Sequence, residues 1–350
     1  MDWLSIEYRD PLFGIIILFA AIFVVSFLGY TIRKNKERKR LDEQSLLVKR
    51  FELGELDASG YLELYISGKL PLDTILLMSN IFCQKGDFSK AITIFLALLE
   101  KTDDTAKKEE ILEQLGKIYY RTGLLQRSKE IFLKILKFSP RNKDALFYLL
   151  LSYEKLKDYN SAIQILEPLI ELGRDVKIDQ SYLYAMKIVS DATLSSEKKI
   201  EQLEKLLVGH IFLERILVSF LIRCDTKLFW QKASLFDFSK IVDILWYLPK
   251  DSVDLEFVKK ESYLSDLYSA KGYFDFSNSS EVFEFDLMIL SKNRTHKSSS
   301  FDFNFEYICE HCKKIHYVYD YRCLTCHSPL SLYPTIKFAK LNFEKNNSFQ

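Results

Sequence analysis

The chain has 350 residues, of which 48% are hydrophobic and 28% are charged, and its formal net charge at pH 7 is +1. This length allows one large domain or two modest ones with a hydrophobic core. A net charge so close to zero argues against a nucleic-acid-binding protein, which usually carries a basic face. Six cysteines are few for a disulfide scaffold, and thiols that stay reduced to hold a metal fit a cytoplasmic compartment.

The stretch from Pro11 to Ile32 contains no charged residue and would span roughly 30 Å as a helix, which matches a bilayer core. Acidic residues on its amino-terminal side disfavour a signal peptide. A basic cluster follows it, and such clusters stay on the cytoplasmic side: Arg33, Lys34, Lys36, Arg38, Lys39 and Arg40. We therefore predict a periplasmic tail at 1–10, a transmembrane helix at 11–32 and a cytoplasmic remainder at the inner membrane.

Residues 33–71 are interpreted as a basic juxtamembrane segment with short linker helices, because glycines interrupt the apolar pattern. A period of roughly 34 residues then begins, with repeats at 72–105, 109–142 and 143–176. Small residues recur where two helices would cross closely: Ser79, Ala91, Gly116, Ser128 and Ala162. Gly86 and Gly123 would turn the chain between helices, whereas the third repeat has Leu150 and Lys157 in the usual glycine places.

This pattern resembles tetratricopeptide repeats, in which stacked helix pairs leave a concave groove. The register places six residues in that groove: Asn80, Gln84, Lys117, Arg121, Glu154 and Lys155. We interpret them as a protein-binding surface. The alternative is a helix face that only contacts water. Helical spacing continues to about residue 270, so degenerate hairpins are expected to extend the array over 72–270.

Residues 271–350 are expected to form a β-rich metal-binding domain. Phe301, Phe303, Phe305 and Tyr307 alternate with polar residues, which is typical of a half-buried strand. Phe283, Phe285 and Leu287 alternate in the same way and predict an earlier strand, and a third short strand is expected at 336–343. The fold class is therefore mainly α, with a transmembrane helix, a helical solenoid and a small β knuckle.

Two Cys-x-x-Cys pairs lie in this last region: Cys309, Cys312, Cys323 and Cys326. A ten-residue loop separates the pairs, which is long enough for a hairpin that brings four thiolates to one ion. Four sulfurs suit zinc best and iron second. The alternatives are four reduced thiols or two disulfides. His311, His316 and His327 flank the motif, but four sulfurs already satisfy zinc.

The whole combination resembles the lipopolysaccharide assembly protein B family of Gram-negative bacteria, whose four-cysteine knuckle is rubredoxin-like. The cysteine spacing and the second repeat carry this resemblance. There are departures: Lys313 and His327 stand where rubredoxin knuckles favour glycine, and Leu324 stands where proline is frequent.

The resemblance implies an inner-membrane adaptor that regulates lipopolysaccharide synthesis and is not an enzyme. Its repeat array would hold a lipid A deacetylase near a membrane-bound ATP-dependent protease, and the metal would be structural, so that its removal loosens the array. One alternative is a membrane-tethered scaffold for another envelope assembly complex, and another is an electron carrier with iron in the knuckle. A hydrolase or transferase has no support, because the chain lacks a phosphate loop, a nucleophile elbow and a metalloprotease helix.

Overall fold

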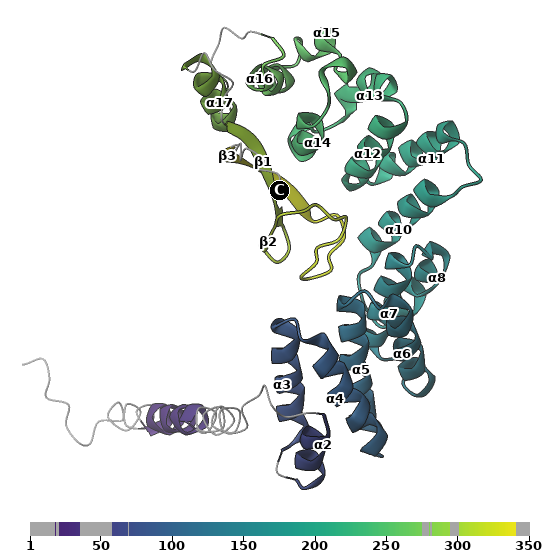
Figure 1. Ribbon diagram of the computed structural model, residues 1–350, viewed down its shortest axis with the longest axis vertical. Helices are drawn as coiled ribbons and strands as arrows, with labels where there is room; N and C mark the ends of the chain where they lie inside the picture. The colour runs from purple at the N-terminus through teal and green to yellow at the C-terminus, as the bar shows by residue number, and fades with distance from the viewer. Residues whose placement is uncertain are drawn as a thin grey trace, which may run out of the picture. The chain divides into compact units, whose positions relative to one another are not determined.

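The computed structural model describes residues 18, 21–35, 58–68, 70–274, 280, 282–294 and 301–340 (Figure 1). The chain divides into two compact units, Met1–Phe138 and Ser139–Gln350. The predicted periplasmic tail, part of the predicted membrane span, the end of the basic cluster and residues 341–343 of the third predicted strand lie outside the described residues.

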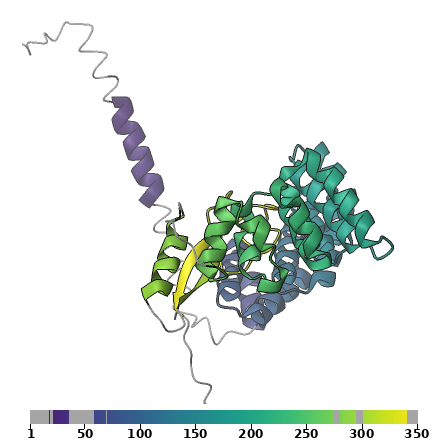
Figure 2. The same cartoon turned by 90° about the horizontal axis from the view of Figure 1, so that it is seen from above.

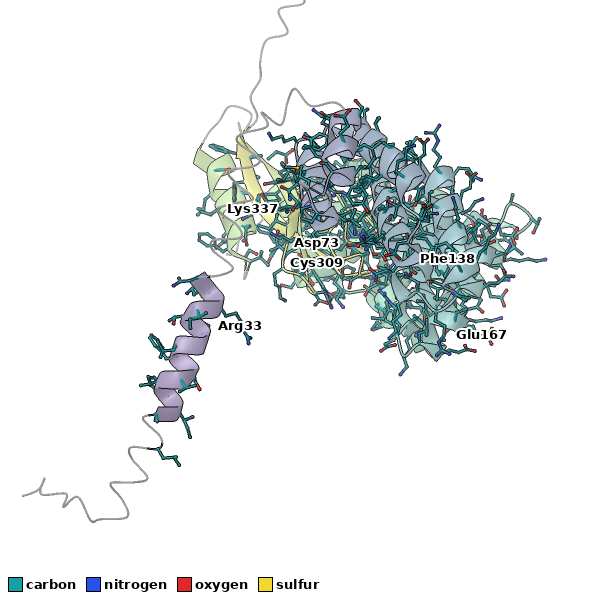
Figure 3. The ribbon with its side chains drawn as sticks, turned by 90° about the horizontal axis from the view of Figure 1, so that it is seen from below. Arg33, Asp73, Phe138, Glu167, Cys309 and Lys337 are labelled. Carbon is teal, nitrogen blue, oxygen red and sulfur yellow. The ribbon has the colours of Figure 1, made fainter. Side chains whose placement is uncertain are left out.

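Residues 21–35 form a helix, seen in purple in Figure 2, whose apolar side chains are exposed. Arg33, from the basic cluster, projects from it (Figure 3). Within the described ranges, no helix combines the length and the apolar character needed to cross a membrane. The span at 11–32 stays a prediction.

The first unit consists of paired helices. After α2 (Ala58–Ile66) come α3 (Leu72–Gln84), α4 (Phe88–Lys101), α5 (Thr105–Arg121) and α6 (Leu125–Phe138). Asp87 and Asp104 cap α4 and α5 by accepting backbone N–H bonds, as good N-cap residues do. Gly86 and Gly123 have φ of 84° and 78°, values that favour glycine, so the two predicted turns are confirmed.

Small residues allow the helices of the first unit to approach closely. The Ser128 hydroxyl on α6 donates a hydrogen bond of 3.0 Å to the carbonyl of Gly116 on α5. A Cβ atom at Gly116 would lie 2.7 Å from the Cζ of Phe132, which is closer than real contacts allow. Ser79 and Ala91 are also fully buried. The sequence prediction of small residues at helix crossings is therefore confirmed in this unit.

The second unit begins with the third predicted repeat. In it α7 (Lys143–Lys155) packs against α8 (Tyr159–Gln164) and α9 (Leu166–Glu171). Lys157 occupies the turn with φ of 62°, in the left-handed region, even though it is not glycine. The second helix of this repeat divides after Gln164 because Pro168 has no N–H to bond with the Gln164 carbonyl.

Helices continue through the region where the repeat signature fades. They are α10 (Lys177–Ser190), α11 (Ser196–Gly209), α12 (Glu214–Cys224), α13 (Thr226–Lys232), α14 (Val242–Trp246), α15 (Leu255–Val258) and α16 (Ser262–Lys271). Short 3-10 turns separate some of them: η1 (Ile211–Leu213), η2 (Ala233–Leu235), η3 (Phe238–Ile241) and η4 (Lys250–Ser252). The helices of this unit follow an arc, and the sheet lies on its inner side (Figure 1).

The sheet has three antiparallel strands in the order β2-β1-β3. They are β1 (Phe301–Cys309), β2 (Ile315–His316) and β3 (Leu332–Lys340), with Phe305 opposite Ile336. Phe303, Phe305 and Tyr307 are buried, which confirms the alternation predicted for the first strand. The third strand starts at Leu332, four residues before its predicted start.

The strand predicted around residues 283–287 is wrong. This segment belongs to the helix α17 (Phe283–Arg294), which packs against α16, β1 and β3. Phe285 and Met288 are fully buried, and their spacing of three positions defines one face of a helix. Phe283, which the alternation treated as equivalent to Phe285, is 70% exposed.

Gly116→Ala should destabilise the first unit by about 1–3 kcal/mol, because the added methyl group overpacks against Phe132. Chemical denaturation followed by circular dichroism measures the change. Gly209→Ala is the matched control, because no atom lies within 4 Å of a Cβ there and alanine is the better helix former. Equal unfolding midpoints for the two variants would contradict the close packing.

Candidate metal centre

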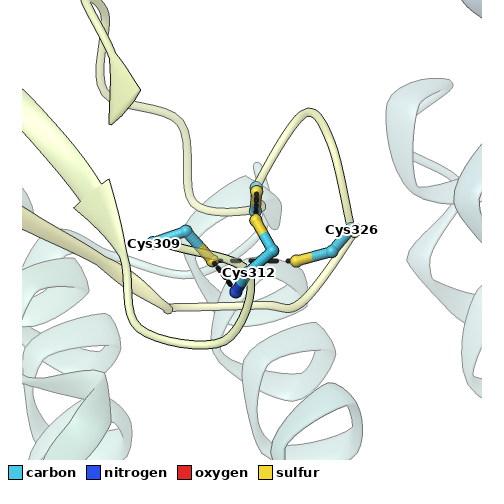
Figure 4. Close-up of side chains that lie close together, drawn as sticks. Cys309, Cys312 and Cys326 are labelled. Carbon is cyan, nitrogen blue, oxygen red and sulfur yellow. Dashed lines mark hydrogen bonds between the residues drawn. The ribbon is translucent and has the colours of Figure 1, made fainter. Parts of the chain in front are cut away.

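Four cysteine sulfurs meet at the end of the sheet. β1 ends at Cys309, the turn into β2 carries Cys312, and the returning chain supplies Cys323 and Cys326. All four Sγ atoms lie within 4.8 Å of one another. The Cys309–Cys326 and Cys312–Cys323 sulfur distances are both 3.7 Å (Figure 4). A tetrahedron with metal–sulfur arms of 2.3 Å has edges of about 3.8 Å. The donor set therefore fits one tetrahedral ion.

The backbone gives each cysteine pair the same local geometry. Lys313 and His327, which follow the second cysteine of each pair, have φ of 58° and 59°. Their N–H groups donate 2.9 Å bonds to the carbonyls of Cys309 and Cys323. The conformation that glycine favours is thus present although glycine is absent. The two departures at Lys313 and His327 therefore change the residue type but keep the left-handed backbone conformation that glycine favours.

Hydrogen bonds to sulfur prepare the site for metal. The Cys312 N–H lies 3.5 Å from the sulfur of Cys309, and the Thr325 N–H lies 3.4 Å from that of Cys323. Burial raises the pKa of Cys309, but bonds from Ser331 and two backbone amides outweigh it and hold the pKa at about 6. Burial, with help from the neighbouring sulfurs, raises the pKa of Cys326 to about 12. A divalent cation held by the four sulfurs would offset the repulsion between neighbouring thiolates.

The four cysteines form no disulfide. The flanking histidines stay outside the four-sulfur cluster. His316 places Nε2 3.2 Å from the sulfur of Cys323, as a hydrogen-bond partner of that sulfur. Burial, followed by the charges of Arg322, Lys155 and Arg174, lowers the pKa of His327 to about 4. Its neutral ring packs edge-on against Phe147 and Tyr148 on α7.

Arg322, directly before Cys323, joins the knuckle to two helices of the array. Its side chain is 2% exposed. Nε and Nη2 donate to the carboxylate of Glu154 on α7 at 2.9 Å and 2.6 Å, and Nη1 donates to Asp179 on α10 at 2.7 Å. The Tyr182 hydroxyl adds a bond to Glu154 at 3.1 Å. One guanidinium therefore connects the loop that carries Cys323 with both helices.

A second buried arginine connects the sheet with the later helices. Arg215 on α12 forms a two-pronged ion pair with Asp243 on α14. The hydroxyl of Tyr307 on β1 donates to the same carboxylate at 2.8 Å, and the ring of Tyr319 lies 3.8 Å from the guanidinium. No local sequence signal distinguishes these two arginines, because their partners lie far away in the chain.

The residues predicted to line the groove fall into two groups. In the first unit Asn80, Gln84 and Arg121 are exposed, and Lys117 pairs with Glu113 at 2.5 Å. In the second unit Glu154 is buried against Arg322, and Lys155 pairs with Asp320 at 2.7 Å. Glu154 and Lys155 therefore contact the knuckle of the same chain.

The fold and the site define a tetratricopeptide-like helical protein with a four-cysteine knuckle. Residues 109–142 match the tetratricopeptide repeat family model, and they are the second of the predicted repeats. The chain is similar to lipopolysaccharide assembly protein B of Escherichia coli K12, with 24% identity over 170 residues. The same protein of Escherichia coli O157:H7 matches equally well. This confirms the resemblance seen in the sequence. The match covers 45% of this chain and 44% of the relative, so it spans less than half of either protein.

Two solved structures are also similar to parts of this chain. MamA 41-end from Desulfovibrio magneticus RS-1 is 22% identical, with a TM-score of 0.34, over 44% of this chain and 85% of its own. A tetratricopeptide repeat protein from Parabacteroides merdae is 16% identical, with a TM-score of 0.38, over 72% of this chain and 98% of its own.

The purified protein should contain one tightly bound zinc or iron ion per chain, measured by inductively coupled plasma mass spectrometry. Cys309→Ser should remove most of it, because three thiolates and a hydroxyl bind metal more weakly. Cys224→Ser, an exposed cysteine outside the cluster, is the control and should keep the full content. Equal metal content in both variants would contradict the site.

Arg322→Ala should destabilise the second unit by about 3–5 kcal/mol, because it leaves the Glu154 and Asp179 carboxylates buried without a cation. Lys155→Ala, at a partly exposed pair, should cost less than about 1 kcal/mol. Denaturant melts of both variants, with metal content measured alongside, provide the comparison. If both variants lost a similar amount of unfolding free energy, the Arg322 ion pairs would stabilise the protein no more than a surface ion pair does.

Proposed function

We propose that this protein is a membrane-tethered adaptor that acts in lipopolysaccharide assembly and has no catalytic activity of its own. The observation that carries the proposal is the joining of a repeat array to a four-cysteine knuckle by buried ion pairs, in a chain similar to lipopolysaccharide assembly protein B. Repeat arrays present extended surfaces for protein partners. The knuckle has the donor set of a structural metal site, because four cysteine sulfurs would fill all four coordination positions of a tetrahedral ion.

The tether is the apolar amino-terminal segment. Its described part is a helix with exposed apolar side chains, and Arg33 and Lys34 follow at the side assigned to the cytoplasm. An anchor in the inner membrane confines the array to a thin layer near the bilayer. Two partners that meet there do so at a raised effective concentration.

The partners that the family resemblance suggests are a membrane-bound ATP-dependent protease and the lipid A deacetylase on which it acts. Asn80, Gln84 and Arg121 offer exposed amide and guanidinium groups on the first helices of two successive pairs. Lys117 lies nearby on the same helix as Arg121. Glu154 and Lys155 support binding indirectly in this proposal, since they hold the knuckle in place.

The test is affinity purification of the tagged full-length chain from native membranes, followed by mass spectrometry. The wild type should recover the protease or the deacetylase. A triple variant, Asn80→Ala, Gln84→Ala and Arg121→Ala, should recover at least about ten-fold less, since ten-fold corresponds to only 1.4 kcal/mol of binding energy.

The matched control carries Gln126→Ala, Lys134→Ala and Lys137→Ala, three exposed positions on α6. The control variant should recover as much of the protease or the deacetylase as the wild type does. If the wild type instead recovered components of another envelope complex, the protein would be a scaffold of that complex and the lipopolysaccharide role would be rejected.

A further inference from the structure

The strand β3 forms one edge of the sheet, whose strand order is β2-β1-β3 (Figure 1). A hydrogen bond just before this strand shows which way its backbone groups point. The Glu310 N–H donates to the Ser331 carbonyl at 2.8 Å, so the backbone of Ser331 faces the chain of β1. Successive residues of a strand direct their N–H and C=O groups to opposite sides. The backbone groups of Pro334, Ile336 and Phe338 therefore point away from the sheet.

Within the described part of the chain, no hydrogen bond reaches these outward backbone groups. Ile336 and Phe338 each offer one N–H and one C=O, whereas Pro334 offers only its carbonyl. Proline at an outward position is typical of an edge strand, because it removes no bond from the ladder. The side chain of Lys337 lies on the opposite face from Ile336, with its ammonium 3.8 Å from Glu306. The backbone edge from Pro334 to Phe338 is therefore open to another strand.

A groove of about 430 Å³ lies beside the same residues of β3. Pro334 and Ile336 are opposite Tyr307 and Phe305, which are buried, so their side chains lie on the face of the sheet that packs against the helices. The groove therefore provides space next to the open edge, on its helix-facing side. Its lining includes Pro334 and Ile336 of β3, Ser239 of η3, Val242 of α14, Tyr263 of α16 and Glu284 of α17.

An added antiparallel strand would use both the open edge and the groove. Its residue opposite Ile336 would donate to the Ile336 carbonyl and accept the Ile336 N–H. The side chain of that residue would lie on the same face as Ile336 and enter the groove, where Val242 and Tyr263 offer apolar contact. β-branched and aromatic side chains suit such a position. The residues before and after it would lie near Thr335 and Lys337 on the other face, where polar side chains fit.

We propose that β3 binds an extended segment of a partner protein as a fourth, antiparallel strand of the sheet. The segment carries a β-branched or aromatic residue opposite Ile336 and polar residues on both sides of it. Main-chain hydrogen bonds to Ile336 and Phe338 supply affinity, and the groove selects the side chain that enters it. This inference rests on the proposed function only in that the protein binds protein partners.

The probe is the peptide acetyl-Glu-Val-Thr-Val-Thr-Val-Lys-amide, titrated against the full-length protein in detergent micelles by ligand-observed NMR. With the valine side chains in the groove, the valine N–H groups face β3 and the threonine N–H groups face away. N-methylation of the second and third valines should weaken binding at least about ten-fold, because bonds to β3 are lost. N-methylation of both threonines is the matched control and should weaken it less than about three-fold. Equal weakening by the two modifications, or no binding of the unmodified peptide, would overturn the proposal.

Two variants locate the binding site on the protein. Ser239→Trp places a large side chain in the groove and should weaken binding of the unmodified peptide at least about five-fold. Ser234→Trp, at an exposed serine of the 3-10 turn η2 outside the groove lining, is the control. Hydrogen–deuterium exchange of the segment 332–340 should slow when the peptide binds the wild type or the control. Equal affinities of the two variants, or exchange in this segment that the peptide leaves unchanged, would contradict the site.

The outcomes separate this inference from the proposed function. Peptide binding that depends on the valine N–H groups, without recovery of envelope partners from membranes, would support strand addition and reject the adaptor role. Recovery of those partners by a protein that does not bind the peptide would reject strand addition and leave the adaptor role standing.

Discussion

The second unit depends on the ion cluster formed by Arg322, Glu154 and Asp179. Three charged groups are removed from water there, and their mutual hydrogen bonds compensate the cost of desolvation. Arg322 is adjacent to Cys323, one of the four cysteines that could hold a metal ion, so the position of the guanidinium depends on the knuckle. The fold of the knuckle and the packing of α7 and α10 are therefore coupled through one residue, and a metal ion held by the four cysteines would strengthen that coupling.

The Arg215–Asp243 pair repeats this arrangement between the sheet and two later helices, α12 and α14. In both places an arginine bridges carboxylates and tyrosine rings: Tyr182 lies near Arg322, and Tyr307 and Tyr319 lie near Arg215. Apolar packing alone would let the sheet slide along the helices. Two directional ion pairs, separated along the array, fix its orientation. We interpret the sheet as a brace for the later, degenerate helix pairs, which lack the regular repeat residues.

Short sequence motifs correctly predicted the features that depend on neighbouring residues in the chain. The second repeat was recognisable because Gly116 and Gly123 serve a close crossing and a left-handed turn, and the cysteine spacing alone predicted the four-sulfur cluster. The segment at 283–287 was misassigned because a five-residue window shows alternation but not the contact between Phe285 and the helix α16 side chain Tyr263. The role of Glu154 was missed because its partner lies 168 positions later in the chain.

That separation has a consequence for biosynthesis. Glu154 and Asp179 precede Arg322 by 168 and 143 residues. At roughly 5–20 residues per second, a ribosome needs on the order of ten seconds or more to add this length. During that interval α7 and α10 have left the ribosome without their guanidinium partner, whereas all helices of the first unit are already complete. The order of synthesis thus favours early folding of the first unit and delays the second until translation reaches its last cysteines.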